Sequence, residues 1–443
     1  MKRSAPRAAD PGGSGGRHAV LVAPPGSYRI AAYLEAAAGL GIAVTVVSEG
    51  EHSLTPAIAS GIAVDLSAPR QAASEIVGRI GHRPVDAVVA TDDRTVEIAA
   101  EIGARFGLEH NPPDAARATR RKDLARARLR EAGVRVPWSA ILSLDAPLED
   151  QTRRLIYPCV VKPLAMSASR GVIRADDPAA LLTACRRVER IIAGEREHEE
   201  RRRVLVEGFV PGPEVALEGM LERGGLRVLA VFDKPDPLDG PFFEETYYVT
   251  PSRLPAACIE AVVEETARAC RALGLRTGPV HAELRVGAGG PWVIEVAART
   301  IGGDCARLLR FGTGHSLEAL VLAQAVGLPL ETSSEHGGAG VLMIPTPAAG
   351  TLRRVEGVLD ASRIPGIEEV SITVREGYEL VPLPEGASYL GFVFARAASA
   401  ADAEAALRAA HAAMRVVVAP LWRIEPAAVS PSLLAAGGAE PLR

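Results

Sequence analysis

Two glutamates stand where they could bind one metal ion together. Glu283 lies in the apolar run Val280–Val286, and Glu295 lies in the next apolar run, after the kind of glycine-rich turn that joins the strands of a β-hairpin. A loop from Gly287 to Pro291 would put the two glutamates directly opposite each other, ~5 Å apart, whereas a loop with an even number of residues would put them on opposite faces. Because carboxylate oxygens are the ligands that Mg²⁺ prefers, an odd loop predicts a magnesium site here.

Three more side chains around this hairpin could take part in chemistry. Arg299 follows Glu295 by four positions, so its guanidinium could stabilise a transferring phosphoryl group, although a structural salt bridge is the alternative. His281 shares the predicted face of Glu283 and could contact a substrate or nucleotide, but the pattern favours a packed strand histidine. Glu245, in an acidic segment upstream, could accept hydrogen bonds from a substrate amino group.

A loop of small residues follows a predicted buried strand and could bind phosphate. The strand ends at Lys162, and the loop Met166–Val172 contains two serines and a glycine, so its backbone N–H groups could approach an anion closely. Lys162 and Arg170 add positive charge, and Lys122 adds more from a predicted basic helix. This combination suits the phosphates of a nucleotide. The alternative is a solvated basic helix beside an ordinary surface turn.

A glycine- and proline-rich link between two strands could recognise the rest of a nucleotide. The link follows a strand that ends at Glu207, and its backbone could meet an adenine edge while Phe209 and Val210 flank the ring. Glu214, in the next strand, could accept hydrogen bonds from both ribose hydroxyls. The alternative is a simple hairpin that carries exposed acidic residues.

The composition argues against several classes of protein. Lys plus Arg is 50 and Asp plus Glu is 54, so the formal net charge is −4, and the chain has no long basic stretch of the kind that binds nucleic acid in general. No apolar segment approaches the roughly 18–20 residues that a membrane-spanning helix needs, so no membrane partner is expected. Residues 1–16 lack the apolar region of a signal peptide. The five cysteines form no C-x-x-C pair and indicate reduced thiols, which predicts a cytoplasmic protein.

The elements that must position these residues predict a multidomain protein. Residues 18–106 alternate between apolar runs and helical patterns, which indicates a parallel sheet covered by helices. A basic helix at 114–132 follows, then short strands between Gly/Pro turns, which indicate mostly antiparallel sheets, and a third pattern begins near residue 338. The 443 residues therefore predict α/β and α+β architecture in five parts: a disordered tail at 1–16, a parallel α/β domain at 17–113, a central domain at 114–335 with a small lobe at about 139–212, a small α+β domain at 336–425, and a tail at 426–443.

In their order along the chain, these motifs resemble the ATP-grasp superfamily of carboxylate–amine ligases. The resemblance runs from about residue 18 to residue 327 and is densest at 119–172 and 204–303. Five separated signals carry it, namely a helix lysine, a strand lysine, a Ser/Gly loop, a linker acid and a Glu/Glu/Arg cluster. The resemblance implies a central ATP-grasp domain preceded by the N-terminal α/β domain.

Two further segments resemble one branch of that superfamily, the bacterial L-amino acid ligases. The stretch from Asp233 to Tyr247 is similar to the substrate-facing loop of those enzymes. The C-terminal part is similar to their closing domain, on Arg354–Gly357, Gly377–Tyr378 and Ser388–Phe392.

The resemblance implies a role for each candidate residue. Glu283 and Glu295 would bind Mg²⁺, with Mn²⁺ as an alternative ion, and Arg299 would be catalytic by stabilising the phosphoryl and acyl-phosphate oxygens. Many ATP-grasp enzymes have an asparagine two residues after the second glutamate as a further metal ligand; this chain has Ala297, which leaves one metal ion or two open. Residues of the two motifs described above would bind ATP: Lys122, Lys162, Ser167, Ser169, Arg170, Gly171, Val172, Glu207, Phe209, Val210 and Glu214.

The implied reaction is the ATP-dependent joining of a carboxylate, expected to belong to an amino acid, to an amine. ATP would convert the carboxylate into an acyl phosphate, and the amine would displace phosphate to give an amide or dipeptide, with closure of the loop at 166–172 excluding water. The expected partners are these small molecules, and a homodimer is consistent with the resemblance. Two alternatives remain: an ATP-grasp carboxylase or purine-pathway-like ligase with another acid and amine, and a non-catalytic nucleotide-binding regulator.

Overall fold

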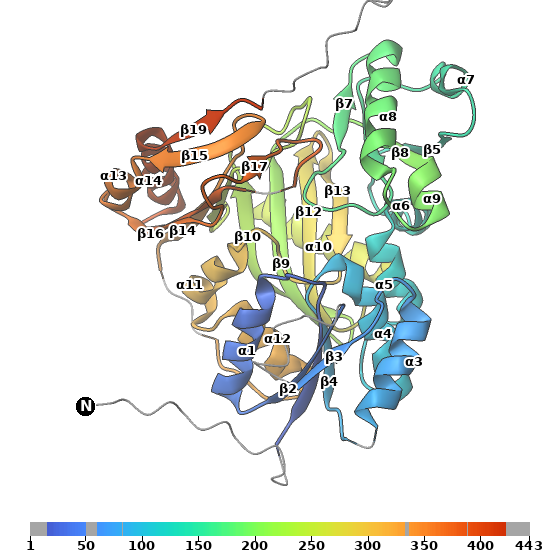
Figure 1. Ribbon diagram of the computed structural model, residues 1–443, viewed down its shortest axis with the longest axis vertical. Helices are drawn as coiled ribbons and strands as arrows, with labels where there is room; N and C mark the ends of the chain where they lie inside the picture. Colours follow the sequence, from blue (N-terminus) through green and yellow to red (C-terminus); the bar gives the residue numbers. More distant parts are fainter. Residues whose placement is uncertain (1–15, 50–59, 82, 333–335, 388, 422–443) are drawn as a thin grey trace, which may run out of the picture.

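The computed structural model shows four regions arranged around one cavity (Figure 1). It describes residues 16–49, 60–81, 83–332, 336–387 and 389–421, so Ser388, the tail predicted at 426–443 and all but the last residue of the tail predicted at 1–16 lie outside the described residues. The N-terminal region lies at the bottom of Figure 1, a small lobe at the upper right, the C-terminal region at the upper left, and a large sheet between them. The predicted fold class is confirmed, because the N-terminal sheet is parallel and the others are antiparallel.

The N-terminal region is a four-stranded parallel sheet with helices packed against it. Its strand order is β3-β2-β1-β4. Because neighbouring strands run in the same direction, the loops after β1 and β4 leave the sheet at the same edge, where ligands bind in open α/β sheets. The elements are β1 (His18–Val22), α1 (Arg29–Leu40), β2 (Ala43–Ser48), β3 (Ser60–Ala63), α3 (Pro69–Ile80), β4 (Ala87–Ala90), η1 (Asp93–Thr95) and α4 (Val96–Phe106).

The small lobe is a four-stranded antiparallel sheet covered by one long helix. The strand order is β5-β8-β6-β7. The covering helix, α8, begins where the Asp177 carboxylate accepts a hydrogen bond from the backbone of Ala180, and its apolar face packs against the sheet. The elements are β5 (Ser139–Ser143), α7 (Leu148–Thr152), β6 (Cys159–Pro163), β7 (Ile173–Ala175), α8 (Pro178–Ile192), α9 (His198–Arg202) and β8 (Arg203–Gly208).

An eight-stranded antiparallel sheet forms the centre of the molecule. Its order is β13-β12-β9-β10-β11-β14-β18-β16. Side chains of β9 alternate between its faces: Val215 and Leu217 pack with α10, whereas Ala216 and Met220 pack toward α1 and α12. The elements that complete this part are β9 (Glu214–Glu222), β10 (Gly225–Lys234), β11 (Tyr247–Thr250), α10 (Ala256–Leu273), β12 (Gly278–Gly287), β13 (Gly290–Ala297), η2 (Cys305–Leu308), α11 (Leu309–Thr313) and α12 (Leu317–Ala325).

The C-terminal region extends the central sheet and adds a small sheet of its own. Strands β14, β18 and β16 continue the central sheet, so it crosses the domain boundary predicted at residue 336. A three-stranded sheet, in the order β17-β15-β19, stands apart. The elements are β14 (Gly338–Ile344), β15 (Gly350–Glu356), α13 (Val358–Ser362), β16 (Ile367–Ile372), β17 (Glu379–Leu380), β18 (Gly391–Ala397), α14 (Ala400–Ala413) and β19 (Arg415–Ala419).

The glutamate hairpin differs from the expected one in its loop. Gly287 pairs with Gly290, so the turn is shorter than the predicted five residues and has an even number of residues. That turn alone would put the glutamates on opposite faces. The register shifts at Glu283, where Ile294 is the extra residue of a β-bulge, and Glu283 then pairs with Glu295. The predicted pairing is therefore present, but the bulge produces it and the loop does not.

The predicted single basic helix is two helices. The chain forms α5 (Pro113–Arg120) and α6 (Lys122–Glu131), and Arg121 between them has an extended backbone. Ion pairs of Arg121 with Asp123 and Glu199 hold it at this break. The prediction of one helix at 114–132 is wrong because these tertiary contacts outweigh local helix propensity. Lys122 consequently begins a helix.

Two expectations drawn from composition agree with the structure. All five cysteines are free thiols. In the described part of the chain, no helix has the length and apolar character required to cross a membrane.

Candidate active site

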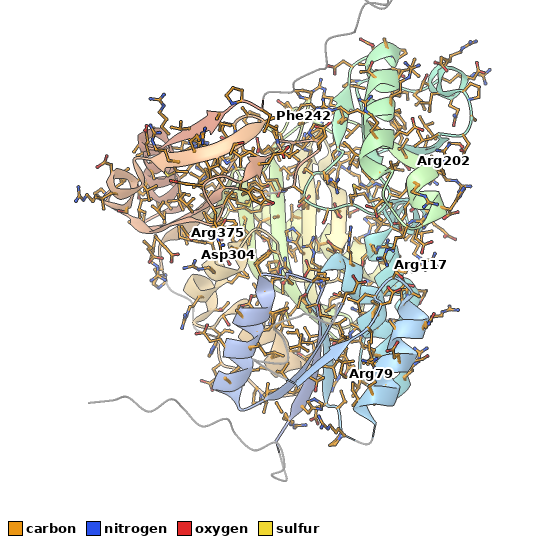
Figure 2. The ribbon with its side chains drawn as sticks, in the orientation of Figure 1. Arg79, Arg117, Arg202, Phe242, Asp304 and Arg375 are labelled. Atoms are coloured by element: carbon orange, nitrogen blue, oxygen red, sulfur yellow. The ribbon has the colours of Figure 1, made fainter. Side chains whose placement is uncertain are left out.

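A cavity of about 650 Å³ lies where the four regions meet. It is lined by every residue that the sequence predicted for the site except Arg170 and Gly171. Figure 2 marks Asp304, another lining residue, near the C-terminal region. The predicted residues that line it are Lys122, Lys162, Ser167, Ser169, Val172, Glu207, Phe209, Val210, Glu214, Glu245, His281, Glu283, Glu295 and Arg299.

Lys122 connects the loop of small residues to the glutamate hairpin. Its ammonium donates to the backbone oxygen of Met166 at 2.8 Å and lies 3.1 Å from Oε1 of Glu295. The backbone N–H of Lys122 also donates to Leu164, which fixes the start of α6 beside the loop. Lys122 can therefore present positive charge between the two motifs.

The loop of small residues contains left-handed backbone conformations, and the N–H groups of Arg170 and Val172 donate to backbone oxygens within the loop. Ala168 and Ser169 adopt left-handed conformations, with φ of 55° and 52°, and Gly171 follows at 72°. Left-handed residues beside right-handed ones turn successive N–H groups toward a common point. Such conformations in residues with a Cβ cost about 1–3 kcal/mol and cluster at functional sites.

Arg170 and Gly171 do not line the cavity and contact the C-terminal region. The Arg170 guanidinium donates to the backbone oxygen of Glu385 at 2.9 Å, and the Gly171 N–H donates to Pro384 at 2.9 Å. Glu385 also forms a two-pronged ion pair, at 2.6 and 2.8 Å, with Arg187 of α8. Figure 2 labels Phe242 at this junction, where it lies under the Arg187 guanidinium. These contacts hold the loop against the C-terminal region.

Both carboxylate oxygens of Glu207 are paired with the cations Arg126 and Lys162. Its Oε2 lies 2.7 Å from the Lys162 ammonium, and Arg126 donates to both of its oxygens. Burial alone would raise the pKa of Glu207, but Arg126 and Lys162 outweigh burial and lower that pKa to about 2. Glu207 thus fixes the Lys162 side chain at the end of β6.

The Glu207 ion pairs predict a pH-dependent stability difference between the protein and its Glu207→Gln variant. Gln leaves Arg126 and Lys162 buried without their counter-charge, so we expect the variant to be less stable by about 3–5 kcal/mol at neutral pH. Because folding lowers the pKa of Glu207 from 4.5 to about 2, its stabilisation is complete above pH 4.5 and is lost as the pH falls toward 2. Urea unfolding at several pH values should show the difference shrinking across that window. A pH-independent difference would contradict the ion-pair account.

The glycine- and proline-rich link between β8 and β9 brings backbone groups and one acid, Glu214, to the cavity. The Phe209 N–H donates to Pro158, and the Val210 carbonyl accepts from Arg285 at 2.8 Å. Nε of Arg285 also lies 2.8 Å from Oε2 of Glu214, and Arg285 stacks over the Phe209 ring. Glu214 is therefore fixed at the start of β9, beside the backbone predicted to meet adenine.

Lys234 joins the site from the end of β10, and the sequence reasoning missed it. Its ammonium lies 2.7 Å from Glu214 and 2.5 Å from Glu245. It also lies 3.3 Å from Oε1 of Glu283. Burial alone would lower the pKa of Lys234, but the three carboxylates outweigh burial and hold that pKa well above its usual value.

His281 lies between two acids in the sheet. Its Nδ1 is 3.2 Å from Glu218 and its Nε2 is 3.4 Å from Oε1 of Glu283. Burial alone would lower the pKa of His281, but these two acids raise it overall. The His281 ring lines the cavity and is also buried within the sheet. Its position is therefore compatible with both alternatives, a residue that contacts a ligand and a packed strand histidine.

Arg299 is oriented by an acid from the N-terminal region. Its Nε and Nη2 both donate to Oδ2 of Asp93 at 3.0 Å, and its Nη1 donates to the backbone of Thr300. The sequence reasoning did not single out Asp93 as a partner. Its position directly after a strand of a parallel sheet was the available signal, because such strand ends line ligand sites. Arg29 donates to the carbonyls of Thr300 and Ile301 and fixes the same segment.

Glu283 and Glu295 have the donor chemistry that suits Mg²⁺. They pair directly across the hairpin, and their recorded contacts with Lys122, Lys234 and His281 fall on Oε1 of each carboxylate. The two carboxylates would hold a hard cation, and phosphate oxygens and water would supply its other ligands. These residues fit the ion, and Ala297 supplies no side-chain ligand.

Three family models match successive parts of the chain. A model described as ATP-grasp domain matches residues 155–307, and a model of the ATP-grasp N-terminal domain matches residues 34–110. The chain belongs to the ATP-grasp family. A third model, L-amino acid ligase C-terminal domain 2, matches residues 342–419, which confirms the resemblance of the C-terminal part of this ATP-grasp protein.

Individual relatives point in the same direction. The crystal structure of an L-amino acid ligase from Bacillus licheniformis superposes with a TM-score of 0.79 and 27% identity, covering 91% of this chain and 99% of that one. An uncharacterized protein, y4rH, from Sinorhizobium fredii is 28% identical across 74% of this chain and 66% of its own length. Dapdiamide A synthase from Enterobacter agglomerans is 30% identical across 40% of this chain and 41% of its own length. The chain thus spans less than two thirds of the length of these two curated relatives.

Proposed function

We propose that this ATP-grasp protein is an ATP- and Mg²⁺-dependent ligase that joins a carboxylate, that of an amino acid, to an amine. The observation that carries the proposal is the meeting, in one cavity, of Lys122, Lys162, the Glu283–Glu295 pair and Arg299. Cations for phosphate, acids for a metal ion and a guanidinium for developing charge are the parts that phosphoryl transfer needs. The names of the relatives support an amino acid as the carboxylate substrate.

Under this proposal each region contributes one part of the reaction. Lys122, Lys162 and the loop Met166–Val172 bind the ATP phosphates, and the link from Phe209 to Glu214 binds the nucleoside. Glu283 and Glu295 hold Mg²⁺, which neutralises phosphate charge when bound, and Mn²⁺ could replace it.

The substrate side of the cavity takes part in both steps of the proposed reaction. The carboxylate attacks the γ-phosphorus, ADP leaves, and the resulting acyl phosphate is attacked by the amine, so that an amide forms and phosphate leaves. Arg299 stabilises the oxygens that gain charge in both steps. Glu245 accepts a hydrogen bond from a substrate amino group, and His281 supports Glu283.

The remaining parts of the proposal concern setting and partners. We propose a cytoplasmic enzyme acting on small molecules, with assembly as a homodimer. A carboxylase or purine-pathway-like ligase would use the same nucleotide side with another acid and amine. The match of residues 342–419 to an L-amino acid ligase domain favours the amino acid ligase.

Measurement of ADP release tests the proposal. We expect no sustained ADP release from ATP and Mg²⁺ alone, and release when the correct amino acid and amine are supplied together, because the acyl phosphate needs an acceptor to turn over. Amino acids should be supplied singly and in pairs, and product mass should equal the sum of the two substrates less one water. If no amino acid stimulates ADP release while bicarbonate does, the carboxylase alternative replaces this proposal. ATP binding without stimulation by either would favour the non-catalytic regulator.

A further inference from the structure

Lys234 stands behind the wall of the cavity and touches three carboxylates that form part of that wall. Its side chain is 2% exposed, and one oxygen from each of Glu214, Glu245 and Glu283 lies within 4.8 Å of the others. Those three acids are among the described residues that line the 650 Å³ cavity, and Lys234 is not. Within the 650 Å³ cavity, Lys234 therefore acts on bound substrates through the carboxylates.

The sequence marks Lys234 as unusual. Among 50 basic residues the chain has four lysines, at 2, 122, 162 and 234, so 50 − 4 leaves 46 arginines. Lys122 and Lys162 line the cavity, and Lys234 contacts its wall. In a chain that uses arginine nearly everywhere else, an ordinary structural ion pair would be expected to use arginine.

The geometry gives a physical reason for lysine at this position. An ammonium is compact and donates three hydrogen bonds in different directions, so it can serve three carboxylates at once. A guanidinium is planar and its fixed fork suits one carboxylate approached side-on, as Arg126 shows with the two oxygens of Glu207. The three acids would repel one another in this buried setting if the ammonium were absent. The three carboxylates could also hold a metal ion, but the ammonium already lies among them.

We propose that Lys234 is a positioning residue that couples the nucleotide, metal and amine subsites, because it holds Glu214, Glu245 and Glu283 in one arrangement. The inference rests on the proposed function, which gives these acids to the ribose, to the substrate amino group and to Mg²⁺ respectively. Loss of the ammonium lets the acids separate, so all three subsites loosen together. A purely structural ion pair would change stability without changing the affinity for two different substrates.

Kinetics of Lys234→Met and Lys234→Arg test the coupling. We expect Lys234→Met to raise the KM for ATP and the KM for the amine by about 10–100-fold each, as for other groups that orient ligand-binding side chains. Lys234→Arg should recover part of both KM values, because it keeps the charge but changes the geometry. Arg253→Met is the matched control: Arg253 pairs with Asp233, the neighbour of Lys234, and touches none of the three acids. Its KM values should remain within twofold of those of the unmodified protein.

The outcomes separate this inference from the proposed function. If the unmodified protein turns over and Lys234→Met has unchanged KM values, or only one raised KM, Lys234 does not couple the subsites. If the unmodified protein shows no turnover, the proposed function fails, and calorimetric binding of Mg²⁺–ATP to the same variants still tests Lys234, with at least tenfold weaker binding expected in Lys234→Met. Circular dichroism checks folding. If Lys234→Met does not fold, Lys234→Arg tests the coupling in its place. An increase of about threefold or more in both KM values, relative to Arg253→Met, would then support the coupling.

Discussion

Replacing Glu295 with glutamine should abolish ADP release while the protein remains folded. The amide cannot supply the charged oxygen that a hard cation prefers, and it also removes the ion pair with Lys122, which lies 3.1 Å away. Turnover should fall by at least about 100-fold, since even residues that only support metal ligands cost 10–100-fold. Lys122, the cation left behind, is 12% exposed and still donates to the backbone oxygen of Met166, so the variant should remain folded.

The measurement is ADP release as a function of Mg²⁺ concentration, with circular dichroism as the test of folding. Glu222→Gln is a suitable control, because Glu222 ends β9 in the same sheet and points into solvent. We expect Glu222→Gln to behave like the unmodified protein. An undiminished rate in Glu295→Gln would remove Glu295 from the metal site and would leave Glu283 to be explained by its contacts with Lys234 and His281.

Local patterns were sufficient to predict the elements and most of the residues around the cavity. Short apolar runs between Gly/Pro turns correspond to β6, β8, β12 and β13. The hairpin shows the limit of such patterns. Its turn has an even number of residues, and a bulge at Ile294 restores the pairing of Glu283 with Glu295. A bulge depends on packing against neighbouring strands, so spacing along the chain cannot reveal it.

Contacts between distant segments were the part that could not be predicted. Asp93 meets Arg299 across 206 positions because the carboxyl end of β4 faces the end of β13. Glu385 meets Arg187 across 198 positions, through folding of the C-terminal region onto the small lobe. The sequence did contain two unused signals: the position of Asp93 after a strand of the parallel sheet, and the scarcity of lysine, which would have directed attention to Lys234.

Arg299→Lys should lower kcat by about 10³-fold while the KM for ATP changes little. In the structure Asp93 holds two of the guanidinium nitrogens, so the plane of the group is fixed before any substrate binds. A lysine keeps the charge but loses the planar fork and the defined direction. Removal of a single well-placed donor to a developing oxyanion costs 10²–10³, and arginines that stabilise phosphoryl transfer contribute 10³–10⁵. Under the proposed function, Lys122 and Lys162 bind the ATP phosphates in the ground state, and the substitution does not touch them.

The Asp93→Asn variant tests what the orientation of Arg299 contributes, because it keeps the guanidinium of Arg299 and removes the carboxylate that holds it. Burial alone would raise the pKa of Asp93, but Arg299 outweighs burial and holds that pKa below its usual value, so the pair is ionised at neutral pH. Asparagine can still accept one hydrogen bond but supplies no charge to hold the guanidinium in place. We therefore expect a kcat between those of Arg299→Lys and the unmodified protein, again with an unchanged KM for ATP. Arg310→Lys, at an exposed position of α11, serves as the control. If Arg299→Lys turned over at the unmodified rate, the guanidinium would have no part in transition-state stabilisation, and its ion pair with Asp93 would serve only to join the N-terminal region to the central sheet.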